Sequence, residues 1–87
     1  MDKEYIILES IDNNSAITQR ELSKKLGISL GAINILINKM VREGLIKIEK
    51  VSTNTILYML TPKGFMEKVN KTYKYIKIHY KYIAETK

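Results

Sequence analysis

The feature that most constrains this 87-residue chain is the stretch TQRELSKKLGISLGAINILINKMVREG, residues 18–44. It opens with a capping box, in which Thr18 caps a helix and Glu21 returns a hydrogen bond three residues later. Gly27 can take a positive φ and end that helix. Ser29 can cap a second helix, which Gly44 ends. Two helices joined by a glycine-centred turn predict a helix-turn-helix, the motif that lays its second helix in a DNA major groove.

A further helix is predicted before this motif. Residues 3–12 carry apolar side chains at helical spacing, and Asp2 is placed to cap them. The residues expected to face inward are Tyr5, Leu8 and either Ile11 or Ile7. The segment 16–17 that leads into the motif is either a short strand or extended chain.

The pattern changes to a period of two after Gly44. Two runs rich in β-branched and aromatic residues, 45–51 and 56–60, flank the polar break 52–55 and predict a β-hairpin. A helix-turn-helix followed directly by a hairpin is a winged helix. The overall prediction is a mostly α, α+β fold: a winged helix-turn-helix of three helices and a wing over residues 1–61, then a C-terminal dimerisation helix over 62–87.

The last helix begins at a clear start signal. Thr61 can cap it, and Pro62 occupies the first position, where its missing N–H costs nothing. Gly64 in the first turn is unfavourable for a helix.

Three phrases carry a resemblance to a known family: LGISLGAIN at 26–34, KMVREGLIK at 39–47 and YMLTPKGFMEK at 58–68. Together they resemble the MarR-type winged-helix transcriptional regulators. The phrase LTPKG after the wing, with LGISLG before it, is most similar to the small subgroup of EPS-associated regulators. The resemblance implies a homodimer that binds a pseudo-palindromic operator in double-stranded DNA and usually represses transcription.

The recognition helix, about 30–43, is predicted to have an inner and an outer face. At 100° per residue, Ile33, Leu36, Ile37 and Met40 turn toward the core. The outer face, which a groove would meet, holds Gly31, Asn34, Ile35, Asn38 and Arg42. Of these, two asparagines one turn apart can offer their amides to adenine edges.

Other residues are predicted to hold the DNA backbone. The N–H groups near Ser29 and Leu30, at the helix start, can bind phosphate. Basic side chains that can contact phosphate are Arg20, Lys24, Lys25, Lys39 and Arg42. On the wing, Lys47 and Lys50 can reach the backbone and Asn54 can enter the minor groove.

Two departures from the family pattern leave an alternative open. Ile35 stands where such recognition helices often carry arginine, and the wing tip, 52–55, lacks the Asp and Arg that MarR-type wings commonly use. An exposed isoleucine can meet a thymine methyl, or it can mark a helix that contacts protein. The alternative function is therefore a winged-helix protein-interaction module within a larger assembly.

The net charge of +6 is unevenly distributed. Residues 1–17 hold four acidic residues and one lysine, whereas residues 18–60 hold seven basic and three acidic residues. Residues 61–87 hold seven basic and two acidic ones. A basic body of this kind favours a polyanion as partner.

The last helix is predicted to form a homodimer. A stripe with alternating spacings of three and four, typical of a coiled-coil seam, consists of Met66, Val69, Tyr73, Ile76, Tyr80 and Ile83. A second apolar set, Tyr75, Ile78 and Tyr82, lies on another face. The rest of the domain can cover only one face, so the other is left for a partner chain. Docking of the seam within its own chain and an interfacial membrane helix are the alternatives.

Several function classes are disfavoured. The chain has no cysteine and a single histidine, His79, and no spacing typical of a metal site, a phosphate loop or a nucleophile elbow. We therefore expect no enzyme, metal or cofactor. No apolar run reaches the ~20 residues of a membrane span, and the N-terminus does not resemble a signal peptide, which favours the cytoplasm. Many MarR-type proteins sense a small ligand, and the tyrosine-rich last helix is the place to look for a pocket.

Overall fold

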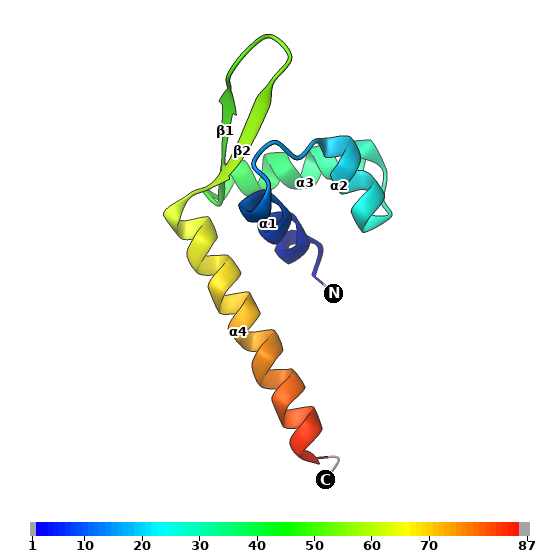
Figure 1. Cartoon of the computed structure of the whole chain (residues 1–87), viewed down its shortest axis with the longest axis vertical. Helices are drawn as coiled ribbons and strands as arrows, with labels where there is room; N and C mark the ends of the chain where they lie inside the picture. The colour runs from blue at the N-terminus through cyan, green and yellow to red at the C-terminus, as the bar shows by residue number, and fades with distance from the viewer. Residues whose placement is uncertain (1, 86–87) are drawn as a thin grey trace.

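The computed structural model describes the backbone of residues 2–85 and the side chains of residues 2–79. Its elements in chain order are α1 (Lys3–Asn13), α2 (Gln19–Leu26), α3 (Leu30–Arg42), β1 (Ile46–Lys50), β2 (Ile56–Leu60) and α4 (Pro62–Glu85). Figure 1 shows α1, α2 and α3 gathered at the base of the β1–β2 hairpin, with the hairpin projecting at one end and α4 at the other. The predicted winged helix-turn-helix with a long C-terminal helix is confirmed.

The helix-turn-helix forms as its capping residues predict. The Thr18 hydroxyl accepts a hydrogen bond from the Glu21 N–H at 3.1 Å, and the Glu21 carboxylate accepts one from the Thr18 N–H at 3.3 Å. Gly27 ends α2 with a φ of 69°. Ser29 then caps α3 by accepting from the N–H of Ala32 at 3.1 Å. Local hydrogen bonds therefore set both ends of the turn.

The ends of two helices differ slightly from the sequence-based prediction. α1 continues to Asn13 rather than ending at residue 12, and α3 ends at Arg42 with Glu43 as its C-cap. The segment 16–17 forms no strand. Ala16 lies in a turn, in which the Ile17 N–H donates to the Asn14 carbonyl at 3.1 Å, and the Ser15 carbonyl accepts a hydrogen bond from the Tyr58 N–H at 2.9 Å.

One hydrophobic core lies between the three helices and the base of the hairpin. Both Ile7 and Ile11 are buried, so α1 uses a wider inner face than either alternative alone. Leu36, predicted to face the core, is only half-buried and packs at its edge. The side chains with almost no exposure are Ile7, Leu8, Ile11, Leu22, Ile33, Ile37, Met40 and Ile46.

The wing is a two-stranded antiparallel hairpin. Its register pairs Ile46 with Leu60 and Ile48 with Tyr58. Tyr58 is only 5% exposed and closes the core from the wing side, whereas Ile48 is exposed. The hairpin is therefore fixed to the body at its base, and its outer part projects into solvent (Figure 1).

The end of α3 is joined to the start of α4 by hydrogen bonds. The Thr61 hydroxyl donates to the Gly44 carbonyl at 2.5 Å and accepts from the Gly64 N–H at 2.9 Å, while the Thr61 N–H donates to the Leu45 carbonyl at 3.1 Å. A Cβ on Gly64 would lie 2.0 Å from that same Leu45 oxygen. Gly64 is therefore required by close packing, which explains a residue that disfavours the helix in isolation.

Candidate nucleic-acid interface

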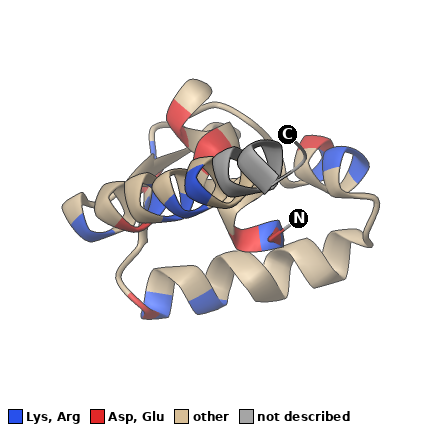
Figure 2. Ribbon diagram, turned by 90° about the horizontal axis from the view of Figure 1, so that it is seen from below, with Lys and Arg blue, Asp and Glu red and all other residues tan. Residues whose placement is uncertain are grey.

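The outer face of α3 is exposed to solvent. Its members, Gly31, Asn34, Ile35, Asn38 and Arg42, are all exposed, and Ile35 is 68% exposed. The opposite face is buried at Ile33, Ile37 and Met40. Figure 2 shows the α3 ribbon without charged positions except near its C-terminal end. The face therefore offers amide and apolar groups along its length and positive charge at its end.

The two asparagines of α3 belong to a chain of side-chain hydrogen bonds. Asn38 Nδ2 donates to Asn34 Oδ1 at 3.1 Å, and Asn34 Nδ2 donates to Gln19 Oε1 at 3.3 Å. Gln19 Nε2 in turn donates to the Tyr58 hydroxyl at 3.1 Å. Neither Gln19 nor Tyr58 was among the predicted site residues. The capping pattern marks only the start of α2. Asn34 and Tyr58, the two partners of Gln19, lie 15 and 39 residues from it in sequence.

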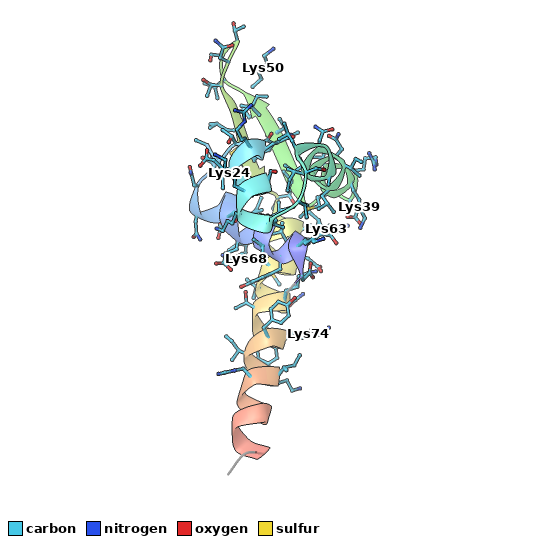
Figure 3. All side chains as sticks on the ribbon, turned by 90° about the vertical axis from the view of Figure 1, so that its right-hand side faces the viewer. Lys24, Lys39, Lys50, Lys63, Lys68 and Lys74 are labelled. Atoms are coloured by element: carbon cyan, nitrogen blue, oxygen red, sulfur yellow. The ribbon has the colours of Figure 1, made fainter. Side chains whose placement is uncertain are left out.

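The predicted phosphate contacts are not all brought to one surface. Arg20 and Lys24 are exposed on α2, as Arg42 is on α3. Lys25 is exposed as well, but it lines a cavity together with residues of α1 and α4. In Figure 3, the labelled side chains of Lys24, Lys39 and Lys50 project from α2, α3 and the wing respectively. The positive charge is thus spread over three elements.

The Lys39 side chain lies against α1 on one side and is open to solvent on the other. Its Nζ lies 3.6 Å from a carboxylate oxygen of Glu4, and its side chain remains half exposed. An exposed ion pair of this kind is worth little, so the lysine can exchange Glu4 for another anion at low cost.

The start of α3 is open for close approach. No atom lies within 4 Å of the position that a Cβ on Gly31 would take. Leu30 is exposed, and the Ser29 hydroxyl already satisfies the Ala32 N–H. The remaining N–H groups of the first turn have no partner within a helix and can receive an anion.

The wing divides its predicted contacts between two faces. Lys47 and Lys50 are three residues apart on β1, so their side chains point to opposite faces of the hairpin. Lys50 shares its face with Tyr58, through the pairing of Lys50 with Ile56. Asn54 lines a cavity with residues 16–19, which brings the wing tip near the start of α2. Lys50 and Asn54 are therefore better placed than Lys47 to act with α2 and α3.

The predicted dimer seam of α4 is exposed over its described part. Met66, Val69, Tyr73 and Ile76 all lie in solvent, and Tyr73 is 67% exposed. Phe65, which the heptad spacing did not include, is also exposed and lines a hollow together with Val69, Tyr73 and Ile76. Figure 1 shows α4 leaving the body as a single rod. The side chains of the last two predicted seam residues, Tyr80 and Ile83, lie outside the described residues.

A different face of α4 is held against α1 by aromatic and polar contacts. The Tyr5 hydroxyl and the Thr72 hydroxyl are hydrogen-bonded at 2.9 Å. The Tyr5 ring meets the Tyr75 ring edge to face, with 5.2 Å between the centroids. This face belongs in part to the second apolar set, whereas Ile78 of that set is exposed. α1 therefore covers one side of α4 and leaves the seam uncovered.

Two ion pairs add to this contact (Figure 3 labels Lys68). Lys68 Nζ lies 2.7 Å from Asp12 Oδ2, and this hydrogen bond raises the pKa of Lys68. Lys71 pairs with Asp2, which raises the pKa of Lys71. Burial works to raise the pKa of Asp2, but the Lys71 hydrogen bond and those from the Tyr5 and Glu4 N–H groups outweigh it and lower that pKa. The acidic α1 thus neutralises lysines of α4.

The described residues contain neither a metal-binding cluster nor a helix that could span a membrane. There, no three His, Cys, Asp or Glu side chains gather into a group that could hold a metal ion. Within the same residues, the helices are all too short or too polar to cross a membrane.

Comparison with known proteins identifies the family to which the chain belongs. Residues 2–47 match the family described as winged helix-turn-helix DNA-binding. The match is to a DNA-binding family, which confirms the prediction that the protein is not an enzyme. A comparison with curated protein sequences finds no relative.

The fold recurs in solved structures of bacterial regulators. MepR, a transcription regulator of the Staphylococcus aureus multidrug efflux pump MepA, superposes with a TM-score of 0.84 at 15% identity, over 98% of this chain and 64% of MepR. Streptococcus pneumoniae FabT in complex with DNA gives 0.78 at 23% identity, over 94% and 59%. The Mycobacterium tuberculosis MarR family protein Rv2887, in complex with p-aminosalicylic acid, gives 0.79 at 14% identity, over 95% and 64%.

These likenesses confirm the resemblance to MarR-type regulators at the level of the fold. The chain spans about six tenths of the length of each of these three structures. The similarity to the EPS-associated subgroup stays a prediction.

Proposed function

Because the chain belongs to the winged helix-turn-helix DNA-binding family, we propose that it is a sequence-specific transcriptional regulator that binds double-stranded DNA as a homodimer. In this proposal α3 lies in the major groove, α4 pairs with its counterpart, and the dimer represses transcription in the cytoplasm by occupying an operator. In this proposal Asn34 and Asn38 read the bases, and the phosphate contacts come from the basic side chains that lie on the same side of the molecule as the outer face of α3.

The observation that carries the proposal is the uncovered outer face of α3. A helix whose inner face is buried at Ile33, Ile37 and Met40, and whose outer face offers two amides and an arginine, matches what a major groove accepts. The groove admits one helix of this diameter, and amides form bidentate pairs with adenine. The FabT structure, which contains DNA, supports the same use of the fold.

The junction between α3 and α4 supports the dimeric part of the proposal. Thr61 bonds to the carbonyls of Gly44 and Leu45, and Lys63 Nζ donates to the Glu43 carbonyl at 2.9 Å. These bonds fix the direction of α4 relative to α3. Two chains paired along α4 would therefore hold their α3 helices at a set distance, as two half-sites about 34 Å apart require.

The first test is fluorescence anisotropy of the purified protein against labelled genomic duplexes, titrated from low to physiological salt. We expect binding to most duplexes to fall steeply with salt, while a subset stays bound at about 10⁻⁸ M or better. If no duplex remains bound at physiological salt, the proposed function is wrong.

Substitutions then separate base reading from backbone contact. Asn34→Ala should weaken binding to the tight duplexes by about 1–3 kcal/mol and leave other duplexes unchanged. Arg42→Ala should weaken binding to all duplexes alike and reduce the salt slope by about one. Asn13→Ala, which truncates an exposed asparagine at the end of α1, is the matched control. Equal losses on every duplex for Asn34→Ala would contradict base reading.

A second candidate function rests on Ile35. A large apolar side chain that is 68% exposed in the centre of the outer face is also what a protein-docking surface presents. If Ile35→Asn leaves all DNA binding unchanged but abolishes capture of a partner protein that the wild type binds, the interaction-module function is favoured.

A further inference from the structure

The side-chain amide of Asn34 is held at both ends although the residue is exposed. Its Nδ2 donates to Gln19 Oε1 at 3.3 Å, and its Oδ1 accepts from Asn38 Nδ2 at 3.1 Å. An exposed asparagine on a helix normally turns between rotamers and exchanges its two amide ends. Here both ends have protein partners, so the plane of the amide is held in place.

The other end of this chain of amides is anchored in the core. Gln19 Nε2 donates to the hydroxyl of Tyr58, whose side chain is 5% exposed. Tyr58 is also fixed through its backbone, because its N–H donates to the Ser15 carbonyl at 2.9 Å. A rigid residue of β2 therefore orients Gln19, which in turn orients Asn34.

We infer that Gln19 is a positioning residue that fixes the Asn34 amide in one orientation and thereby sets which base edge α3 can read. This inference rests on the proposed function, because it names the device by which Asn34 selects its base. It also assigns to the wing an indirect part in sequence reading, since the anchor, Tyr58, belongs to β2.

The orientation has a chemical consequence for the base. The two hydrogen bonds of Asn34 use one of the two Nδ2 hydrogens and one of the two Oδ1 lone pairs. The other hydrogen and the other lone pair remain available to a base. With Nδ2 toward Gln19 and Oδ1 toward Asn38, Asn34 offers a donor on one side and an acceptor on the other. Adenine presents N7 as acceptor and its N6 amino group as donor, so it fits in one direction, whereas guanine presents two acceptors and does not fit.

The test compares two substitutions of Gln19 in the full chain. Gln19→Met keeps the length of the side chain but removes the donor and the acceptor. Gln19→Glu keeps an acceptor for Asn34 Nδ2 and can accept from the Tyr58 hydroxyl, so the orientation of Asn34 is retained. The base pair read by Asn34 is first identified as the one at which Asn34→Ala reduces discrimination among duplexes the most, with part of the discrimination remaining.

We expect Gln19→Met to reduce discrimination at that base pair roughly three- to tenfold, the range expected when one side chain must be immobilised on binding. Gln19→Glu should preserve the discrimination, although its charge weakens binding to all duplexes. In the Asn34→Ala background, Gln19→Met should cause no further loss of discrimination.

A readout without DNA is given by the side-chain NH₂ resonances in ¹⁵N-labelled protein. In the wild type, the Asn34 NH₂ protons should exchange with water more slowly than those of the exposed Asn70. Gln19→Met should bring the Asn34 exchange rate close to that of Asn70, and Gln19→Glu should leave it slow.

Three results would overturn the inference: retained discrimination in Gln19→Met, an equal loss on every duplex, or the same loss in the Asn34→Ala background. The equal loss would mean that Gln19 contacts the DNA backbone itself. A wild-type protein that binds every duplex alike would overturn the proposed function and the base-reading consequence together. The exchange measurement would then still decide whether Gln19 orients Asn34.

Discussion

The two longest helices, α3 and α4, both carry an apolar face, but they bury it differently. The α3 face that contains Ile37 is completely enclosed by its own chain. The α4 seam, in contrast, leaves Tyr73 and Ile76 more than 60% exposed. The difference is not one of composition, because both stripes consist of large apolar side chains at helical spacing.

A periodic apolar stripe therefore predicts that one face of a helix is buried, but it does not predict which surface buries that face. For α3 the covering surface is α1, α2 and the wing base. α1 also covers α4, but it does so through Thr72, Tyr75 and two lysines, on a face beside the seam. The polar outer face of α3 and the apolar seam of α4 are thus the two surfaces left for partners, and the proposal assigns them to DNA and to a second copy.

The largest effect should come from truncating the enclosed stripe. Ile37→Ala removes three carbons from a fully buried site and should lower the free energy of unfolding by about 2–5 kcal/mol. Ile76→Ala, at an exposed site, should change the stability of the monomer by less than about 0.5 kcal/mol. Urea unfolding of both variants at low protein concentration measures this difference. Equal losses of unfolding free energy would contradict the different burial of the two stripes.

A second pair of variants tests the junction between the two helices. Gly64→Ala should destabilise the fold by about 1–3 kcal/mol, because the new Cβ would lie 2.0 Å from the Leu45 oxygen and force α3 and α4 apart. Gly31→Ala, where the Cβ meets no atom, should be neutral or stabilise by up to about 1 kcal/mol. Thermal unfolding of the two variants checks the sign, and a tolerated Gly64→Ala would contradict the close approach.

A third prediction addresses self-association. Ile76→Ala should raise the dimer dissociation constant about tenfold or more, because the truncation occurs twice in a symmetric interface. Lys77→Ala, its exposed neighbour on another face, is the control and should have little effect. Sedimentation velocity over a concentration series measures both. Loss of association in the control alone would place the interface elsewhere on α4.

The smallest effect concerns the ion pair that holds α4 to α1. Asp2→Asn keeps the helix cap but loses the charge, and should cost less than about 1 kcal/mol at neutral pH because the pair is partly exposed. The pKa of Asp2 is lowered by folding, so its contribution is present above the unfolded value near 3.8 and is lost as pH falls through the folded value. The stability of wild type and variant should therefore converge below about pH 4, as measured by chemical unfolding across pH.

The sequence predicted those features that local chemistry determines. The capping box at Thr18 and Glu21, the left-handed Gly27 and the two faces of α3 follow from residues within a few positions of each other. These features were sufficient to identify the winged helix and the outer face of α3.

Features that depend on distant contacts could not be predicted. The role of Gly64 depends on the Leu45 carbonyl, and the orientation of Asn34 depends on Gln19 and Tyr58. The pairing of Lys39 with Glu4 likewise joins α3 to α1. No periodic pattern encodes such pairs, because their partners become neighbours only when the chain folds.

In the proposed dimer, the apolar face of α3 is buried by its own chain and the seam of α4 is buried by a second copy. Two α3 helices therefore contact one DNA site. The most direct test is the mass of the complex by analytical ultracentrifugation, with a duplex that stays tightly bound at physiological salt. We predict two chains per duplex, and a protein that sediments alone at about twice its 10.1 kDa chain mass. A single chain per tightly bound duplex would contradict the proposed dimer. So would a protein that remains monomeric at concentrations well above those that saturate the duplex.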